Sequence, residues 1–266
     1  MQAFEFSIPQ NIQFGVGSLS KLTDILGKVG SGRVMLVSGP SLARLGVVKQ
    51  VEDIIAGAGI SCEKFVDVEP NPSAETVQKA ARLMGEAGAT AIVALGGGSP
   101  MDVAKAVGVI AAHGGHITEY EGAGKVPGPI APLVCIPTTA GTGSEVTNVA
   151  VITDEARNYK LTVSSPYLAP SHVILDPKLI MSTPAPVAAA CGMDALIHAI
   201  EAYVSRIATP FTDVMAEKAM ALIGQNIRQF VACRTDEEAA CAMLLGSTFA
   251  GIAFSRAKVG NVHAMS

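Results

Sequence analysis

Short apolar runs alternate with longer amphipathic runs over the first two thirds of the chain. The short runs are bounded by turn residues and predict buried strands at residues 33–39, 61–68, 90–98 and 131–139. The longer runs predict helices at residues 47–59, 74–88 and 100–115, each of which ends in glycine. Strands that alternate with helices are typical of βαβ units, so we expect an α/β domain with a parallel sheet.

The pattern changes after Pro184 and Pro186, where long apolar runs follow one another without a strand signal. These runs predict helices at residues 187–205, 210–231 and 236–254. We therefore place a domain boundary near residue 182. Residues 1–182 are expected to form the α/β domain, and residues 183–266 an all-helical domain.

The composition allows a large core and argues against several classes of partner. Hydrophobic residues make up 49% of the 266 residues and charged residues 16%, so disorder is not expected. The net charge is −4 without a basic run, which disfavours nucleic acid as a partner. The start of the chain lacks the features of a signal peptide, and no apolar run is long enough to span a bilayer. Because the five cysteines also lack a CxxC spacing, we expect a cytoplasmic protein with reduced thiols and no membrane partner.

A glycine-rich loop joins the predicted strand at 90–98 to the helix that follows it. Gly96, Gly97 and Gly98 remove side chains at the turn, and their backbone N–H groups suit an anionic phosphate at a helix N-terminus. Ser99 is expected to cap that helix, with Asp102 as the acid of a capping box. A tight strand-to-helix turn explains the same residues equally well.

A second loop, residues 136–147, also follows a predicted strand. It combines hydroxyl groups, among them Thr138, Thr139 and Thr142, with glycines, which suits contacts to ribose and phosphate. A turn rich in serine and threonine is nearly as good an explanation. Since both loops leave the carboxyl ends of strands in one sheet, where ligands of open α/β sheets bind, together they favour a nucleotide.

The segment GMDALIHAIEAYVS, residues 192–205, contains ionisable residues in an otherwise apolar predicted helix. Asp194 and His198 are four residues apart and share one helix face, so they can pair with each other or hold one metal ion. His263 can join them from a later segment, and one Asp with two His fits Fe(II), Zn(II) or Mn(II). Spacing alone favours the simple Asp–His pair. Cys191 is a conceivable further ligand, although a small buried hydrophobe is the better interpretation.

Four segments together resemble a known family. GGGSPMDVAKA, PTTAGTGSEVT and GMDALIHAIEAYVS, in this order, are similar to motifs of the iron-containing (group III) alcohol dehydrogenases, and GNVHAMS resembles their later metal motif. The resemblance is greatest to the branch of lactaldehyde (propanediol) reductases and 1,3-propanediol dehydrogenases. It implies a Rossmann-like, dinucleotide-binding α/β domain followed by an all-helical metal-binding domain.

The resemblance also implies a reaction. In that family a divalent metal, held here by Asp194, His198 and His263, acts as a Lewis acid on the alcohol oxygen. Hydride passes between NAD or NADP and a short-chain primary alcohol or diol, or the aldehyde in reverse. Iron(II) is the expected metal, with zinc(II) as the second choice. The implied partners are a small alcohol or aldehyde and further copies of the chain, in a homodimer or larger homo-oligomer.

The cofactor-binding residues implied by the resemblance lie at matching positions of its motifs. They are Gly39, Asn71, Gly96, Gly97, Gly98, Ser99, Asp102, Thr138, Thr139, Thr142 and Lys160. Members that prefer NAD carry an acid at the position of Gly39, which bonds the ribose 2′-hydroxyl and repels a 2′-phosphate. Glycine removes this repulsion, so we predict that NADP(H) is accepted.

The sequence is also compatible with two alternative functions. Family members continue through further helices that carry another histidine ligand, so the resemblance implies a C-terminally truncated chain with an incomplete helical domain. Such a chain could bind nucleotide without turnover. Glycerol dehydrogenases and dehydroquinate synthase-like enzymes use the same Asp/His/His metal set on the same fold. The sequence shows no basic cluster that would hold the acidic, phosphorylated substrate of the latter.

Overall fold

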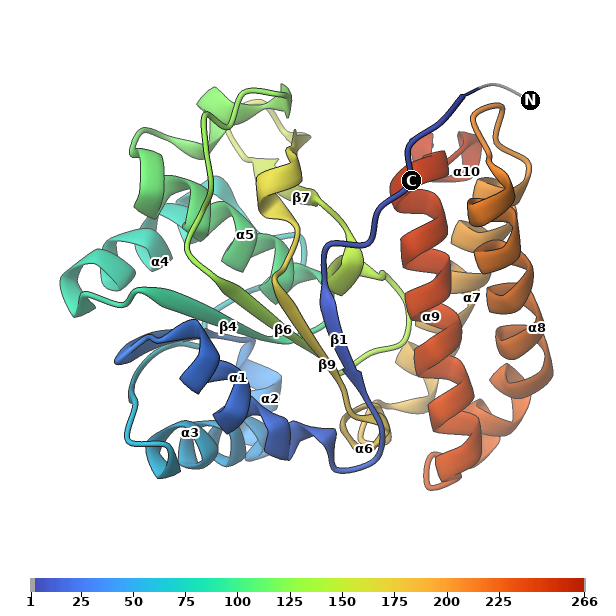
Figure 1. The fold of residues 1–266 in the computed structure, drawn as a ribbon, viewed down its shortest axis with the longest axis horizontal. Helices are drawn as coiled ribbons and strands as arrows, with labels where there is room; N and C mark the ends of the chain where they lie inside the picture. The colour runs from blue at the N-terminus through green and yellow to red at the C-terminus, as the bar shows by residue number, and fades with distance from the viewer. Residues whose placement is uncertain (1–2, 266) are drawn as a thin grey trace.

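A six-stranded parallel sheet lies at the centre of the first part of the chain (Figure 1). The computed structural model describes residues 3–265. In spatial order the strands are β1 (Asn11–Phe14), β9 (His172–Leu175), β6 (Leu133–Pro137), β4 (Ala91–Gly96), β2 (Arg33–Val37) and β3 (Ser61–Phe65). All neighbouring strands pair in parallel, which confirms the predicted α/β class and each of the four predicted strands.

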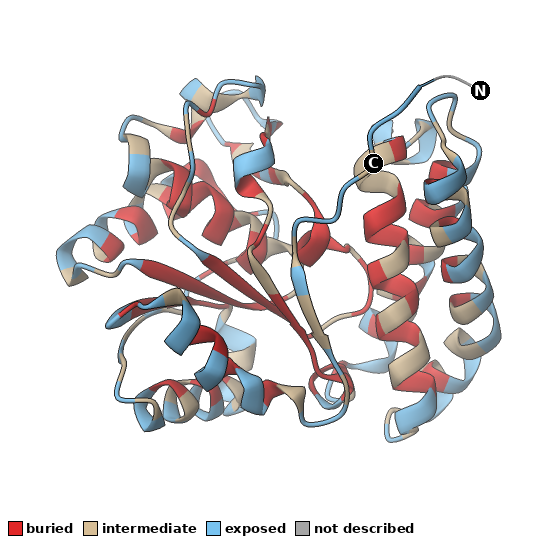
Figure 2. Cartoon of the chain, viewed as in Figure 1, coloured by how far each residue is buried: buried red, intermediate tan, exposed pale blue. Residues whose placement is uncertain are grey.

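Helices cover both faces of this sheet because its inner strands are apolar on both sides. Val34 and Leu36 of β2 pack with α1 (Leu22–Val29) and α3 (Val47–Gly57) in one core. Met35 and Val37 face the other way and pack with α4 (Ala74–Ala87) and α5 (Gly98–His113). Such two-sided burial is typical of parallel sheets. Figure 2 shows the central strands buried along their length.

The sequence pattern missed the edge strand β1 and a small second sheet. That sheet consists of β5 (Gly122–Ala123), β8 (Tyr159–Ser164) and β7 (Val149–Asp154), with β7 and β8 antiparallel. In β8 only Leu161 and Val163 are buried, so the strand alternates over too few residues to stand out. The short length of β1 hides it in the same way.

The last part of the described chain is helical, as predicted. It contains α7 (Ala185–Tyr203), α8 (Pro210–Ala232), α9 (Glu237–Ala257) and the short α10 (Asn261–Ala264), and no strand follows β9 within residues 3–265. Side chains of Thr209 and Asp236 accept backbone N–H bonds at the starts of α8 and α9 and so fix where these helices begin. The proposed boundary near residue 182 falls between α6 (Pro177–Ile180) and α7 and stays a prediction.

Two of these helices, α7 and α9, have the length and hydropathy of a membrane span. The expectation that no segment meets this criterion was wrong, because these helices carry only scattered polar residues. Both helices pack against each other and against α8, and 61% of the most apolar window of α9 is buried. Since core helices of globular proteins have the same composition, the two helices are weak evidence for a membrane protein.

Candidate nucleotide and metal site

The order of the strands marks where a ligand can bind. After β2 the chain adds β3 on one side, and β4 then pairs with β2 on the other side. This reversal leaves an opening outside the carboxyl ends of β2 and β4, the usual ligand position in open α/β sheets. Gly39 follows β2, and the glycine-rich loop follows β4. The two predicted cofactor segments therefore meet at this point of the sheet.

The glycine-rich loop starts α5 without a side-chain cap. Gly97 is the N-cap residue and Gly98 begins the helix, so the expectation that Ser99 caps it with Asp102 as the acid of a capping box was wrong. The helix starts two residues earlier, directly after the turn at Gly96, which has φ 150° and where a Cβ would lie 2.7 Å from Pro100. Backbone N–H groups without a side-chain cap at the start of a long helix suit an anion such as a phosphate.

The second loop packs directly on the first. A Cβ at Gly97 would lie 3.1 Å from Oγ1 of Thr139, and one at Gly98 would lie 3.0 Å from Cγ2 of Thr142. The backbone N–H of Thr138 donates to the oxygen of Gly96 at 2.9 Å. The glycines are thus required for contact between the loops, whether or not a phosphate binds there.

Asp102 also lies near the start of α5, but both of its carboxylate oxygens already accept hydrogen bonds from other residues of the protein. One of its carboxylate oxygens accepts from Ser144 Oγ at 2.8 Å, and the other accepts from the backbone N–H of Val151 at 3.1 Å. The neighbouring Lys105 is fully buried and donates to oxygens of Ser144, Thr147 and Val149. Burial lowers the pKa of the Lys105 ammonium, and the charge of Asp102 opposes this shift. Both residues therefore hold the second loop to α5.

The remaining predicted cofactor residues, Asn71 and Lys160, come together at the small sheet. The backbone oxygen of Asn71 accepts from Thr153 Oγ1 at 3.0 Å, and Thr153 is the cross-strand partner of Lys160. Asn71 has φ 52°, a left-handed conformation that asparagine tolerates better than most residues. Its predicted cofactor contact and that of Lys160 stay predictions.

The predicted metal ligands converge in the structure. Three ligand atoms, one from each of Asp194, His198 and His263, lie within 4.8 Å of one another. We call these residues the Asp–His–His cluster. Asp194 Oδ1 is 3.3 Å from His263 Nε2, and its Oδ2 is 3.7 Å from His198 Nδ1. The two imidazole rings stack with centroids 4.1 Å apart. Helix α7 supplies the first two residues and α10 supplies the third.

The cluster fits a metal ion better than it fits a closed hydrogen-bond network. His198 Nδ1 is buried and has no hydrogen-bond partner among the described residues. A buried polar nitrogen without a partner is unfavourable, and two ligands of one tetrahedral ion lie about 3.4 Å apart. Burial, opposed by Asp194, lowers the pKa of His198 to about 4, which keeps the ring neutral as a metal ligand must be.

The second loop also contacts the helix that carries the cluster. A Cβ at Gly141 would lie 2.7 Å from Cβ of Cys191 on α7. Gly143 meets Gly251 of α9 in a similar close approach. Burial raises the pKa of the Cys191 thiol, which agrees with a packed thiol and not with a thiolate ligand.

Glu201 is a buried acid near the cluster that the sequence analysis did not single out. It follows Asp194 and His198 on one face of α7, at spacings of seven and three residues, and this spacing was the available signal. Its carboxylate accepts from His263 Nδ1 at 2.5 Å and from the backbone N–H of Val262 at 2.7 Å. Burial raises the pKa of Glu201, but these hydrogen bonds outweigh it and the net shift is downward.

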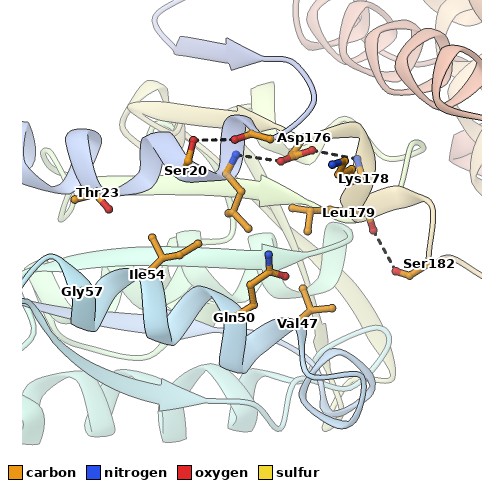
Figure 3. A pocket seen from close by; sticks show the side chains of 12 residues that line it. Ser20, Thr23, Val47, Gln50, Ile54, Gly57, Asp176, Lys178, Leu179 and Ser182 are labelled. Atoms are coloured by element: carbon orange, nitrogen blue, oxygen red, sulfur yellow. Dashed lines mark hydrogen bonds between the residues drawn. The ribbon is translucent and has the colours of Figure 1, made fainter.

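A separate pocket of about 760 Å³ lies between α3 and the region of α6 (Figure 3). Asp176, an acidic residue that lines it, already accepts from the backbone N–H groups of Leu19 and Lys178. Gln50 and Leu179 also line it, whereas none of the predicted cofactor or metal residues does. The pocket is therefore distinct from the candidate site.

Comparison with known protein families agrees with this arrangement. Residues 9–177 match the family described as iron-containing alcohol dehydrogenase, and residues 188–266 match the C-terminal part of the same family. The chain belongs to the iron-containing alcohol dehydrogenase family. As a member it is an oxidoreductase of the NAD-dependent alcohol dehydrogenase type, and its fold is that of the family.

Relatives of this iron-containing alcohol dehydrogenase are similar over nearly its whole length. The NAD-dependent methanol dehydrogenase of Bacillus methanolicus is 40% identical over 98% of this chain and 68% of its own. A crystal structure of a 1,3-propanediol oxidoreductase gives a TM-score of 0.97 at 38% identity, covering 99% of this chain and 69% of its own. A sulfoacetaldehyde reductase from Bifidobacterium kashiwanohense, in complex with NAD+, gives 0.95 at 35% identity, covering 99% and 70%. The chain thus spans about two thirds of the length of these relatives.

Proposed function

We propose that this protein transfers hydride between a nicotinamide cofactor and a short-chain primary alcohol or diol, or the corresponding aldehyde in reverse. The names of similar proteins, a methanol dehydrogenase and a 1,3-propanediol oxidoreductase, support a short-chain alcohol or diol as the substrate class. The observation that carries the proposal is the convergence of the Asp–His–His cluster beside the second loop, where Gly141 approaches Cys191 of α7.

Two regions of the chain would supply the metal-binding and the cofactor-binding residues. Asp194, His198 and His263 would hold a divalent metal, iron(II) first and zinc(II) second, as the donor set allows. When bound, such an ion supplies a Lewis acid for the alcohol oxygen. The uncapped start of α5 would hold the cofactor pyrophosphate, while Thr139 and Thr142 line the adjoining loop. The packing of this loop on α7 keeps the two regions in contact.

We further propose that NADP(H) is accepted beside NAD(H), because Gly39 follows β2 without an acidic side chain that would repel a 2′-phosphate.

A cytoplasmic location and a homodimer or larger homo-oligomer complete the proposal. Exposed apolar side chains in the helical region, such as Val204 and Val214, support self-association. Sedimentation of the purified chain tests this, and a monomer at micromolar concentration contradicts it.

Metal content tests the proposed function directly. The chain is purified without oxygen, and iron, zinc and manganese per chain are counted by mass spectrometry for wild type, Asp194→Ala and the exposed control Asp24→Ala. NAD(P)H formation from 1,3-propanediol is measured in parallel. We expect near-stoichiometric metal and turnover in wild type and control, with loss of both in Asp194→Ala. Metal-free wild type that still binds NADP(H) would instead indicate a nucleotide-binding chain without turnover.

A further inference from the structure

A carboxylate behind the cluster links two elements that are far apart in the sequence. Glu201 lies on α7 and is only 7% exposed, so its charge requires partners. Its Oε2 lies 2.5 Å from His263 Nδ1, and its Oε1 accepts from the backbone N–H of Val262 at 2.7 Å. Both partners belong to α10. One side chain of α7 therefore holds both the start of α10 and its histidine.

The segment before α10 is shaped around this carboxylate. Gly260 is the N-cap residue of α10 and has no side chain with which to cap it. A Cβ at this position would lie 2.9 Å from Glu201 Oε1. Glycine thus leaves room for Glu201 to reach the backbone N–H groups that a local cap would otherwise bind. The close approach indicates a built contact and not a chance encounter of two surfaces.

The hydrogen bond from Nδ1 fixes the direction of the His263 ring. A carboxylate cannot donate, so the proton of this bond belongs to Nδ1, and in a neutral ring Nε2 then keeps its lone pair. That nitrogen lies 3.3 Å from Asp194 Oδ1. Two acceptors at this distance repel each other unless a cation lies between them. The ring therefore presents Nε2 to the place where a metal would bind.

We propose that Glu201 is the positioning residue of the metal site: it selects the Nδ1–H tautomer of His263 and holds α10 so that Nε2 faces Asp194 and His198. The inference rests on the proposed function, since it assumes that the Asp–His–His cluster binds a metal. When the second ring nitrogen of a metal-bound histidine donates a hydrogen bond to a carboxylate, the carboxylate orients the histidine and increases its basicity. Loss of such a partner weakens metal binding by about 10- to 100-fold.

Cobalt(II) provides a test that does not depend on turnover, because its visible absorption reports binding directly. The chain is titrated with Co(II) as wild type, Asp194→Ala, Glu201→Gln and the control Glu238→Gln, which changes an exposed acid of α9. We expect Glu201→Gln to raise the Co(II) dissociation constant about 10- to 100-fold and Glu238→Gln to leave it within about twofold. Far-UV circular dichroism checks that each variant is folded.

The outcomes separate the inference from the proposed function. Tight binding by wild type that Asp194→Ala abolishes, together with unchanged binding by Glu201→Gln, overturns the role of Glu201 and leaves the metal site intact. Equal binding by wild type and Asp194→Ala overturns the metal site and the inference with it.

A measurement on the wild type remains decisive if Glu201→Gln fails to fold. Nitrogen-15 NMR of the histidine-labelled, zinc-loaded chain reports which ring nitrogen of His263 carries the proton. We expect the proton on Nδ1, and a proton on Nε2 overturns the inference. Gly260→Ala supplies a second variant, because its methyl group displaces Glu201 without changing the charge. It should weaken Co(II) binding in the same direction.

Discussion

The buried ammonium of Lys105 donates a hydrogen bond to the backbone oxygen of Ser144 at 2.7 Å, and this bond joins α5 to the second loop. The same ammonium reaches Ser144 Oγ at 2.9 Å, Thr147 Oγ1 at 3.0 Å and the oxygen of Val149 at 2.8 Å. The loop that touches both the glycine-rich turn and α7 is therefore held to α5 by this buried charge and by the hydrogen bond from Ser144 Oγ to Asp102.

Removal of this charge should destabilise the protein strongly. Lys105→Met keeps most of the volume but leaves several buried oxygens without donors and Asp102 without its neighbouring positive charge. We expect a loss of about 3–5 kcal/mol in the free energy of unfolding, measured by urea denaturation. Lys79→Met is the control, since Lys79 forms only an exposed ion pair with Glu75 and should change stability by less than about 1 kcal/mol. Equal losses in the two variants would contradict the structural role of Lys105.

Cofactor choice should respond to an acid at position 39. Gly39→Asp introduces a charge that repels a 2′-phosphate, so we expect the KM for NADP(H) to rise more than about tenfold relative to that for NAD(H). A Cβ at this position lies 3.2 Å from the backbone oxygen of Val68, which requires a small local shift. Gly39→Asn makes the same shift without the charge and should not alter the ratio. A wild type that strictly selects NAD(H) would show that glycine at this position does not admit NADP(H).

Two glycines within helices should respond to alanine in opposite directions. Gly251 of α9 approaches Gly143, and a Cβ there would lie 2.7 Å from Cγ2 of Val146, so Gly251→Ala should lower stability by about 1–3 kcal/mol. Gly224 of α8 has no atom within 4 Å of such a Cβ, so Gly224→Ala should raise stability by up to about 1 kcal/mol through helix propensity. Thermal unfolding followed by circular dichroism measures both. A stabilised Gly251→Ala would show that the loop and α9 are not in close contact.

Glu69 should contribute stability that depends on pH. Burial raises its pKa, but hydrogen bonds from Ser73 and Thr76 outweigh this, so the folded-state pKa lies below the usual 4.5. A lowered carboxylate pKa contributes stability that is present above about pH 4.5 and is lost as the pH falls through the folded-state value. We therefore expect the wild type to lose more in Tm than Glu69→Gln between about pH 7 and about pH 3. The exposed control Glu86→Gln should follow the wild type, and equal losses in all three would exclude this role for Glu69.

The central strands, the long helices and their class could be read from the sequence because each signal is local. Apolar runs such as that of β4 are buried on both faces, and glycine ends α4 at Gly88 in the left-handed conformation that this residue allows. The edge strand β1 gives no such signal, since none of its residues is fully buried. The start of α5 was misjudged because the chain turns at Gly96, in a conformation open to glycine, and the helix begins before Ser99.

By itself, the sequence determined which residue types are available for chemistry: Asp194 and His198 one turn apart on α7, and glycine-rich loops after two strands. Only the tertiary structure decided which of these residues meet. It joined His263 to Asp194, occupied both oxygens of Asp102 within the protein, and placed Glu201 behind the histidine. The physical reason is that periodicity orders side chains along one helix or strand, whereas a site depends on contacts between elements. Those contacts are selected by packing and by the need to satisfy buried polar groups, and both are properties of the folded chain.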